Sequence, residues 1–143
     1  MSKLTVGHTF SSDKEMIDTI NPQHIIFAAN STPPAKVLEL FRNKWMPLVV
    51  LLGSWEHQLE QSYLCEFDML GMVRDAGFLK GEECIMLLGP IDGNNGRPAV
   101  LVYSDERPSE YIGQLKQVPA SEAEHAPAYS YDAQRCQYFM VTE

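Results

Sequence analysis

The apolar runs of this sequence are short, and each is bounded by residues that favour turns or helix caps. Four of them read HIIFAA, PLVVLLG, ECIMLLG and RPAVLVY. Their β-branched and aromatic residues predict buried strands. The longest run, MPLVVLLG, is far shorter than the ~20 residues that a membrane-spanning helix needs. A chain of 143 residues is long enough to bury one substantial core.

Three segments carry helix signals. Residues 11–20 contain Ser12 followed by Glu15, the spacing of a capping box. Residues 31–45 offer Thr32 as a cap and a proline at the first helical position. The segment that starts at Asp68 reads as a third helix, with a glycine at 77 to end it.

The order of these segments predicts an α+β fold. A strand, a helix and a strand occupy residues 24–53, which is the length of a βαβ unit. The turn sequence IDGNNG joins two strong strands into a hairpin. A weaker edge strand is expected in EYIGQLKQV, a last strand in QYFMVT and an exposed loop at 119–128. We therefore expect a single α+β domain over 1–143, with a mixed five- to six-stranded sheet and two or three helices.

Residues 53–67, GSWEHQLEQSYLCEF, are compatible with two structures. A helix capped by Ser54 would place Trp55, Leu59 and Tyr63 on one stripe. A strand that follows a turn at Gly53–Trp55 would instead alternate its side chains between two faces. One face would carry Leu59, Gln61, Tyr63, Cys65 and Phe67, and the other Glu60, Ser62, Leu64 and Glu66. We favour the strand because Tyr, Cys and Phe are poor helix formers.

The succession IIFAANS, LLGSW, EQSYL and DAGFLKGEECIML resembles a family of small uncharacterised bacterial α+β proteins. The family carries an Asn after the first core strand and an E-x-S-aromatic-Leu segment, which Asn30 and residues 60–64 match. Gln61 departs from the proline more usual between Glu and Ser. The resemblance covers residues 24–90 and implies a strand at Glu60–Phe67. It implies no catalytic activity.

Five polar or aromatic residues form the candidate binding pocket: Asn30, Trp55, His57, Glu60 and Ser62. A buried glutamate at a strand centre would have a raised pKa if it lacked partners. No metal site is expected, because the sequence lacks H-E-x-x-H and its other histidines are unpaired. No cofactor is expected either, since neither GxGxxG nor a P-loop occurs.

Charge and composition exclude more functions than they identify. Nineteen acidic residues against eleven Lys and Arg give a net charge of −8, which disfavours nucleic acid as a partner. With no predicted membrane span and no secretory signal, a cytoplasmic location is expected. The leading hypothesis is a non-enzymatic binding or protein-interaction domain of a bacterium or mobile element, with a basic protein as its partner.

The competing hypothesis is an enzyme. A small hydrolase or metal-dependent enzyme would use Glu60 with His57, assisted by Asn30 or Ser62. Cys65 paired with His24 or His57 is the other nucleophilic arrangement that the residue types permit.

The C-terminal segment is rich in aromatic residues. Tyr129, Tyr131, Tyr138 and Phe139 fall within eleven residues, and two long helices cannot cover both faces of the expected sheet. Exposed apolar patches and open edge strands both favour association. We therefore predict a homodimer formed partly by this region. The three cysteines show no CxxC spacing, so no disulfide framework is expected, and Cys84 and Cys136 should be buried.

Overall fold

The computed structural model describes residues 4–93 and 95–142, and it contains four short α-helices, one 3₁₀ turn and eight strands within them. Their order along the chain is as follows: α1 (Asp13–Ile20), β1 (His24–Ala28), α2 (Pro34–Asn43), β2 (Leu48–Trp55), β3 (Gln58–Glu66), η1 (Phe67–Met69), α3 (Leu70–Asp75), β4 (Cys84–Leu88), β5 (Arg97–Tyr103), β6 (Glu110–Val118), α4 (Ala120–Ala123), β7 (Tyr129–Asp132) and β8 (Gln137–Thr142).

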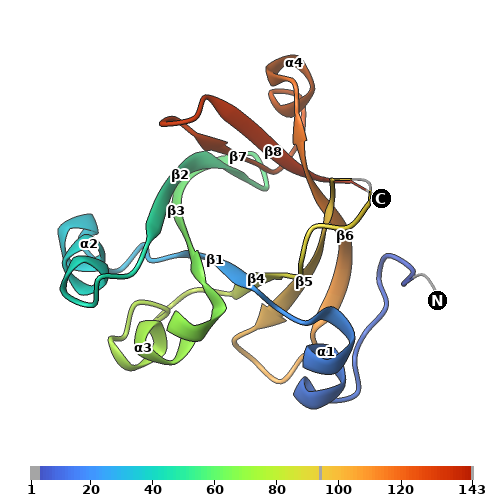
Figure 1. Ribbon diagram of the computed structural model, residues 1–143, viewed down its shortest axis with the longest axis horizontal. Helices are drawn as coiled ribbons and strands as arrows, with labels where there is room; N and C mark the ends of the chain where they lie inside the picture. The colour runs from blue at the N-terminus through green and yellow to red at the C-terminus, as the bar shows by residue number, and fades with distance from the viewer. Residues whose placement is uncertain (1–3, 94, 143) are drawn as a thin grey trace.

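The eight strands form a closed barrel in the order β1-β3-β2-β7-β8-β6-β5-β4, and all neighbouring strands are antiparallel (Figure 1). The predicted mixed five- to six-stranded sheet is therefore wrong. The two strands of the expected βαβ unit do not pair, because β3 lies between them and bonds to both. Closure also corrects the edge-strand prediction for β6, which is paired on both sides.

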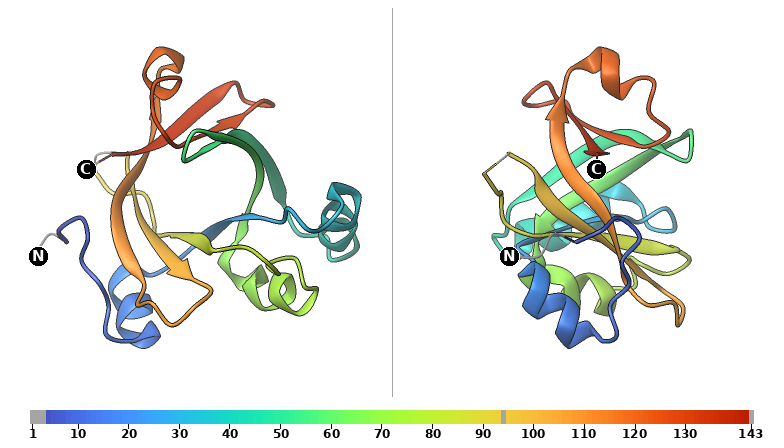
Figure 2. Two further views of the ribbon diagram at one scale, coloured as in Figure 1. Left: turned by 180° about the vertical axis from the view of Figure 1, so that it is seen from behind. Right: turned by 90° about the vertical axis from the view of Figure 1, so that its right-hand side faces the viewer.

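The strands of the barrel wall carry apolar side chains on both their outer and their inner face. Their sequences are therefore continuous apolar runs and do not alternate with polar residues. Partners in the register point to the same side, so Ile25 with Cys65 and Phe27 with Tyr63 face outward. Ile26 with Leu64 faces the barrel interior. Helices α1, α2 and α3 pack outside the ring over β1, β3 and β4, whereas α4 lies apart on the opposite side (Figures 1 and 2).

The main hydrophobic core lies between these three helices and the outer face of the wall. Phe27 stands at its centre, with ring centroids 5.3 Å from Tyr63 and 6.4 Å from Phe41. Met16 of α1 and Val73 of α3 are buried in the same cluster. Aromatic pairs at such distances add to the stabilisation that burial supplies.

The helix signals are largely confirmed. Ser12 caps α1 by accepting a hydrogen bond from the Glu15 backbone N–H at 3.1 Å. The cap of α2 is Pro33 rather than Thr32, and Pro34 takes the first helical position. Asp68 lies inside the 3₁₀ turn that precedes α3 instead of capping that helix. None of the described helices is long and apolar enough to cross a bilayer.

Residues 53–67, which were compatible with a helix or a strand, contain strand β3. Its side chains alternate between the two faces that the strand interpretation predicts. Its turn, however, lies at Glu56–His57 rather than at Gly53–Trp55, and both turn residues have positive φ, 51° and 65°. This is the geometry of the two-residue hairpin turn that normally selects Asn-Gly. The neighbouring chain supports it, since the His57 N–H donates to the Pro127 carbonyl at 2.9 Å.

The structure also tests the predicted hairpin, the predicted loop at 119–128 and the predicted burial of two cysteines. The hairpin of β4 and β5 is confirmed, although Asn94 of its turn lies outside the described residues. Residues 119–128 are mostly exposed, as predicted, but contain helix α4. Cys84 is only partly buried and Cys136 is exposed, so the prediction that both are buried is wrong.

The barrel closes where β2 meets β7, and Gly53 permits this contact. A Cβ added at Gly53 would lie 2.1 Å from the Tyr129 carbonyl oxygen. Gly53→Ala should therefore lower the free energy of unfolding by about 1–3 kcal/mol, the usual effect of overpacking. Chemical denaturation monitored by circular dichroism measures the change.

Gly71→Ala provides the matched control in α3, where an added Cβ meets nothing within 4 Å. It should raise stability by roughly 0.5–1 kcal/mol, because alanine favours helix over glycine. Equal stability of the two variants would contradict the close approach of β2 and β7.

Candidate functional site

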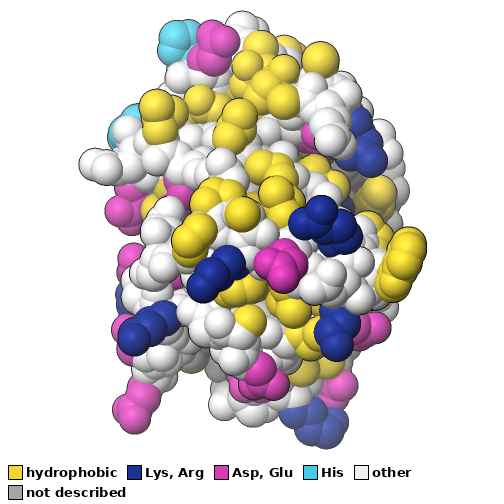
Figure 3. Space-filling view, turned by 90° about the vertical axis from the view of Figure 1, so that its left-hand side faces the viewer, with side chains coloured by type: hydrophobic (Ala, Val, Ile, Leu, Met, Phe, Trp, Pro, Cys, Tyr) yellow, Lys and Arg dark blue, Asp and Glu magenta, His cyan; other side chains and the backbone are white. Residues whose placement is uncertain are grey.

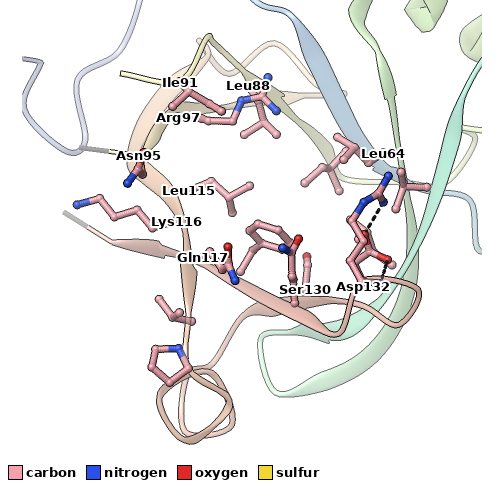
Figure 4. A pocket seen from close by; sticks show the side chains of 18 residues that line it. Leu64, Leu88, Ile91, Asn95, Arg97, Leu115, Lys116, Gln117, Ser130 and Asp132 are labelled. Carbon is pink, nitrogen blue, oxygen red and sulfur yellow. Dashed lines mark hydrogen bonds and ion pairs between the residues drawn. The ribbon is translucent and has the colours of Figure 1, made fainter. Parts of the chain in front are cut away.

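The interior of the barrel contains a cavity of about 940 Å³. Side chains from opposite walls of the ring point into it, with Arg97 and Leu88 on one wall and Ser130 and Asp132 on the other (Figure 4). Eight strands give an interior that side chains can just fill or that can hold one small ligand. In this barrel, much of one end is left unfilled.

The strand register explains which residues line the cavity. Val49 and Leu64 are partners and face inward, as do Arg97 with Leu115 and Ser130 with Phe139. Six leucine, isoleucine and valine positions of the wall strands contribute apolar surface: Ile26, Val49, Leu51, Leu64, Leu88 and Leu115. The lining is therefore mainly apolar with a few polar groups, the composition typical of a small-molecule site.

Arg97 is the main charged group on the cavity wall. It is partly buried; its Nε donates to the Gly89 carbonyl at 2.8 Å, and its Nη2 lies 2.6 Å from Nδ1 of His24. Burial and the adjacent guanidinium lower the pKa of His24. The imidazole is therefore neutral at pH 7, and the nitrogen that faces Arg97 accepts its hydrogen bond.

Asp132 and Arg135 form a second polar feature of the same end. Asp132 is 4% exposed and accepts hydrogen bonds from the backbone N–H groups of Gln134 at 3.1 Å and Arg135 at 3.4 Å. The Arg135 Nη1 adds an ion pair at 2.8 Å from the carboxylate. This aspartate is fully engaged in holding the β7–β8 turn.

The other end of the barrel is acidic and contains most of the predicted pocket. The Asn30 Nδ2 donates to Glu82 at 3.2 Å and to Glu60 at 3.5 Å, while the Asn30 backbone N–H donates to Glu82 at 3.0 Å. Burial raises the pKa of Glu60, Asn30 opposes this shift, and the charge of Glu82 adds to it. Asn30 thus bridges two carboxylates that repel each other.

The remaining predicted pocket residues separate into two groups. Trp55 lines a smaller cavity of about 220 Å³ together with Glu60, and Ser62 is a buried inward-facing residue two positions along β3. His57 is exposed in the β2–β3 turn and does not line this cavity. The structure therefore unites Asn30, Trp55 and Glu60, with Ser62 further along the same strand, but not His57.

The metal and nucleophile hypotheses find no support in this geometry. Among residues 4–93 and 95–142, no three His, Cys, Asp or Glu side chains are arranged to hold a metal ion. Cys65 faces outward into the helix-covered core, whereas His24 faces the barrel interior. Burial raises the pKa of the Cys65 thiol to about 12, so it stays protonated and is a poor nucleophile at neutral pH.

Neither a family model nor a curated protein matches the sequence. The barrel and the side chains within it are therefore the basis for a functional proposal.

Sequence reasoning missed Arg97 of the cavity wall and its hydrogen bond to His24. These two residues are separated by 73 positions and meet only because β1 and β5 both flank β4. The only local indication of this contact in the sequence is Arg97 itself, a cationic residue at the start of the otherwise apolar strand β5.

An uncharged aromatic surface covers the outer face of β2, β3, β7 and β8. Tyr131 lies 4.5 Å from Tyr138 between ring centroids, and Tyr129 lies 6.0 Å from it. Leu52 and Leu59 extend the surface and are 48% and 88% exposed. Figure 3 shows hydrophobic side chains gathered in its upper part, at the height of β7 and β8. Phe139, in contrast, lines the interior cavity and not this surface.

The homodimer remains a prediction, and this outer aromatic surface is where it should form. The molecule carries a net charge of −8, so a second copy can approach most closely where outward side chains are uncharged. Leu59→Asp should convert a dimer into a 16 kDa monomer, measured by light scattering at micromolar concentration, without unfolding the domain.

Trp45→Asp is the control, because Trp45 is 93% exposed and lies before the start of β2, away from the β2–β3 turn near Leu59. A monomeric wild-type protein, or equal dissociation by both variants, would contradict the predicted interface.

Removing the charge of Glu60 should stabilise the protein at neutral pH. Because the folded state raises the pKa of this carboxyl above its ordinary value of 4.5, ionisation opposes folding as the pH increases from there. Glu60→Gln keeps an acceptor for Asn30 and removes the repulsion with Glu82. Its melting temperature should exceed that of the wild type at pH 7, and the difference should vanish near pH 4.

Glu39→Gln on the exposed face of α2 controls for the loss of one negative charge. A Glu60→Gln difference that is the same at both pH values, or equal to that of the control, would contradict this account.

Proposed function

We propose that the protein is a non-enzymatic binding protein that holds an apolar small molecule inside its barrel. The observation that carries this proposal is the cavity of about 940 Å³ that lies between the strands and opens at one end of the barrel. Small-molecule sites occupy ~300–1,000 Å³ and are lined mainly by apolar side chains. The cavity lies at the upper end of that range.

The character of the lining supports binding of an apolar ligand. Leucine, isoleucine and valine side chains of β1, β2, β3, β4 and β6 face the cavity, and Phe139 adds an aromatic ring from β8. Transfer of apolar surface from water into such an environment contributes roughly 25 cal/mol per Å². A ligand with an extended apolar part would therefore gain most from entering the barrel.

The polar groups of the barrel favour binding over catalysis. His24 accepts a hydrogen bond from Arg97, Asp132 holds a turn, and the Tyr103 hydroxyl donates to Glu110 at 3.0 Å. Each of these side chains is engaged in positioning another group. The competing enzyme hypothesis needs His57 beside Glu60, and His57 lies in the exposed turn at the barrel rim.

Binding of a neutral, environment-sensitive dye tests the proposal. Phenylnaphthylamine should fluoresce strongly with the wild-type protein and saturate at one dye per chain. Ser130→Trp places an indole into the cavity from β7 and should weaken dye binding by about tenfold or more, because the added side chain occupies the ligand volume.

Ser121→Trp on the exposed helix α4 is the matched control and should leave dye binding unchanged. Absence of saturable dye binding to the wild type would overturn the proposed function. Equal loss in both variants would do the same, because it would place the dye outside the barrel.

A further inference from the structure

We propose that the barrel ligand is an amphipathic monoanion, a carboxylate with a hydrocarbon tail, and that Arg97 binds its carboxylate. This inference rests on the proposed function and names the class of ligand that the same cavity takes. The tail would lie along Ile26, Leu51 and Leu64, and the carboxylate would lie at the end of the barrel where β4 ends and β5 begins.

Arg97 carries a charge that no neighbouring side chain neutralises within the described residues. Within residues 4–93 and 95–142, no carboxylate lies within ion-pair distance of this guanidinium. Its contacts with Gly89 and His24 engage two of its five N–H groups. A partly buried cation without a counter-ion is unfavourable, and a ligand carboxylate would supply both the charge and the remaining acceptors.

Two hydrogen bonds hold the Arg97 side chain in a fixed orientation. The Gly89 carbonyl fixes Nε, and the neutral His24 imidazole fixes Nη2, so the guanidinium plane is oriented before any ligand arrives. Glu66, the register partner of His24, is exposed and outside ion-pair distance of Arg97. A pre-oriented guanidinium loses little conformational entropy when it binds a carboxylate.

Charge is distributed unevenly along the barrel. Three charged side chains face the large cavity, and two of them, Arg97 and Arg135, are cationic. Lys116 alternates with the inward-facing Leu115 and extends away from the cavity (Figure 4). The third, Asp132, is already paired with Arg135. The chain as a whole has nineteen acidic residues against eleven Lys and Arg, so this end departs from the rest of the molecule. Glu60 and Glu82 at the opposite end would repel an anion.

Displacement of phenylnaphthylamine by two ligands of equal chain length tests the inference. Dodecanoate should bind the wild-type protein about tenfold or more tightly than dodecanol, since a hydrogen-bonded ion pair adds to the same tail contribution. Arg97→Met should abolish this difference by weakening dodecanoate binding. Arg42→Met, on the exposed side of α2, should retain the full preference.

The outcomes separate the two proposals. Equal affinity of dodecanoate and dodecanol for the wild type overturns the carboxylate inference but leaves binding of an apolar molecule intact. An acid preference that persists in folded Arg97→Met overturns the role of Arg97. If Arg97→Met fails to fold, Arg97→Lys decides: loss of at least half of the preference supports a guanidinium contact, and full retention contradicts it. Failure of dye and both ligands to bind overturns the proposed function itself.

Discussion

The pairing of β2 with β7 is the contact on which the rest of the structure depends. It involves only the register pairs of Leu52, Gly53 and Ser54 with residues 129–131, yet it converts an open eight-stranded sheet into a closed ring. Without it, β2 and β7 would be edge strands with unpaired backbone groups. The inward faces of the strands would then line an open surface rather than a cavity. A glycine stands at the centre of this pairing because the β7 backbone comes too close for a side chain.

Local sequence patterns identified most of the strands but not their partners. Apolar runs, the Ser12 cap and the hairpin of β4 and β5 depend on neighbouring residues, so the sequence alone predicts them. Pairing order depends on contacts between distant segments. In the β1 run, both Ile25 and Ile26 are apolar, because one faces the helix-covered core and the other the barrel interior. The strand therefore lacks the alternation of apolar and polar residues that would have predicted a barrel.

The β2–β3 turn shows a second physical reason for incomplete prediction. Glu56 and His57 both adopt positive φ, which disfavours side chains by about 1–2 kcal/mol per residue relative to glycine. Long-range contacts offset this strain: the Pro127 carbonyl accepts hydrogen bonds from the His57 N–H and from the Ser54 hydroxyl. Such a turn carries no local signature. The structure brings Asn30, Trp55 and Glu60 together and holds His57 apart from them in this turn, so a binding pocket of all five residues stays a prediction.

The two walls of the cavity differ in how firmly they are held. The wall of β1, β3 and β4 has helices packed behind it, whereas β7 and β8 carry half-buried tyrosines on their outer face. The same two strands supply Ser130 and Phe139 to the interior. Strands with few buried contacts open most readily, so a ligand would enter the barrel where β7 and β8 separate from β2. Any association that covered the outer tyrosines would stabilise the same two strands and would therefore be thermodynamically linked to occupancy of the cavity. The short β2–β7 pairing closes the fold, and it is also where the proposed ligand binding and the predicted dimer would influence each other.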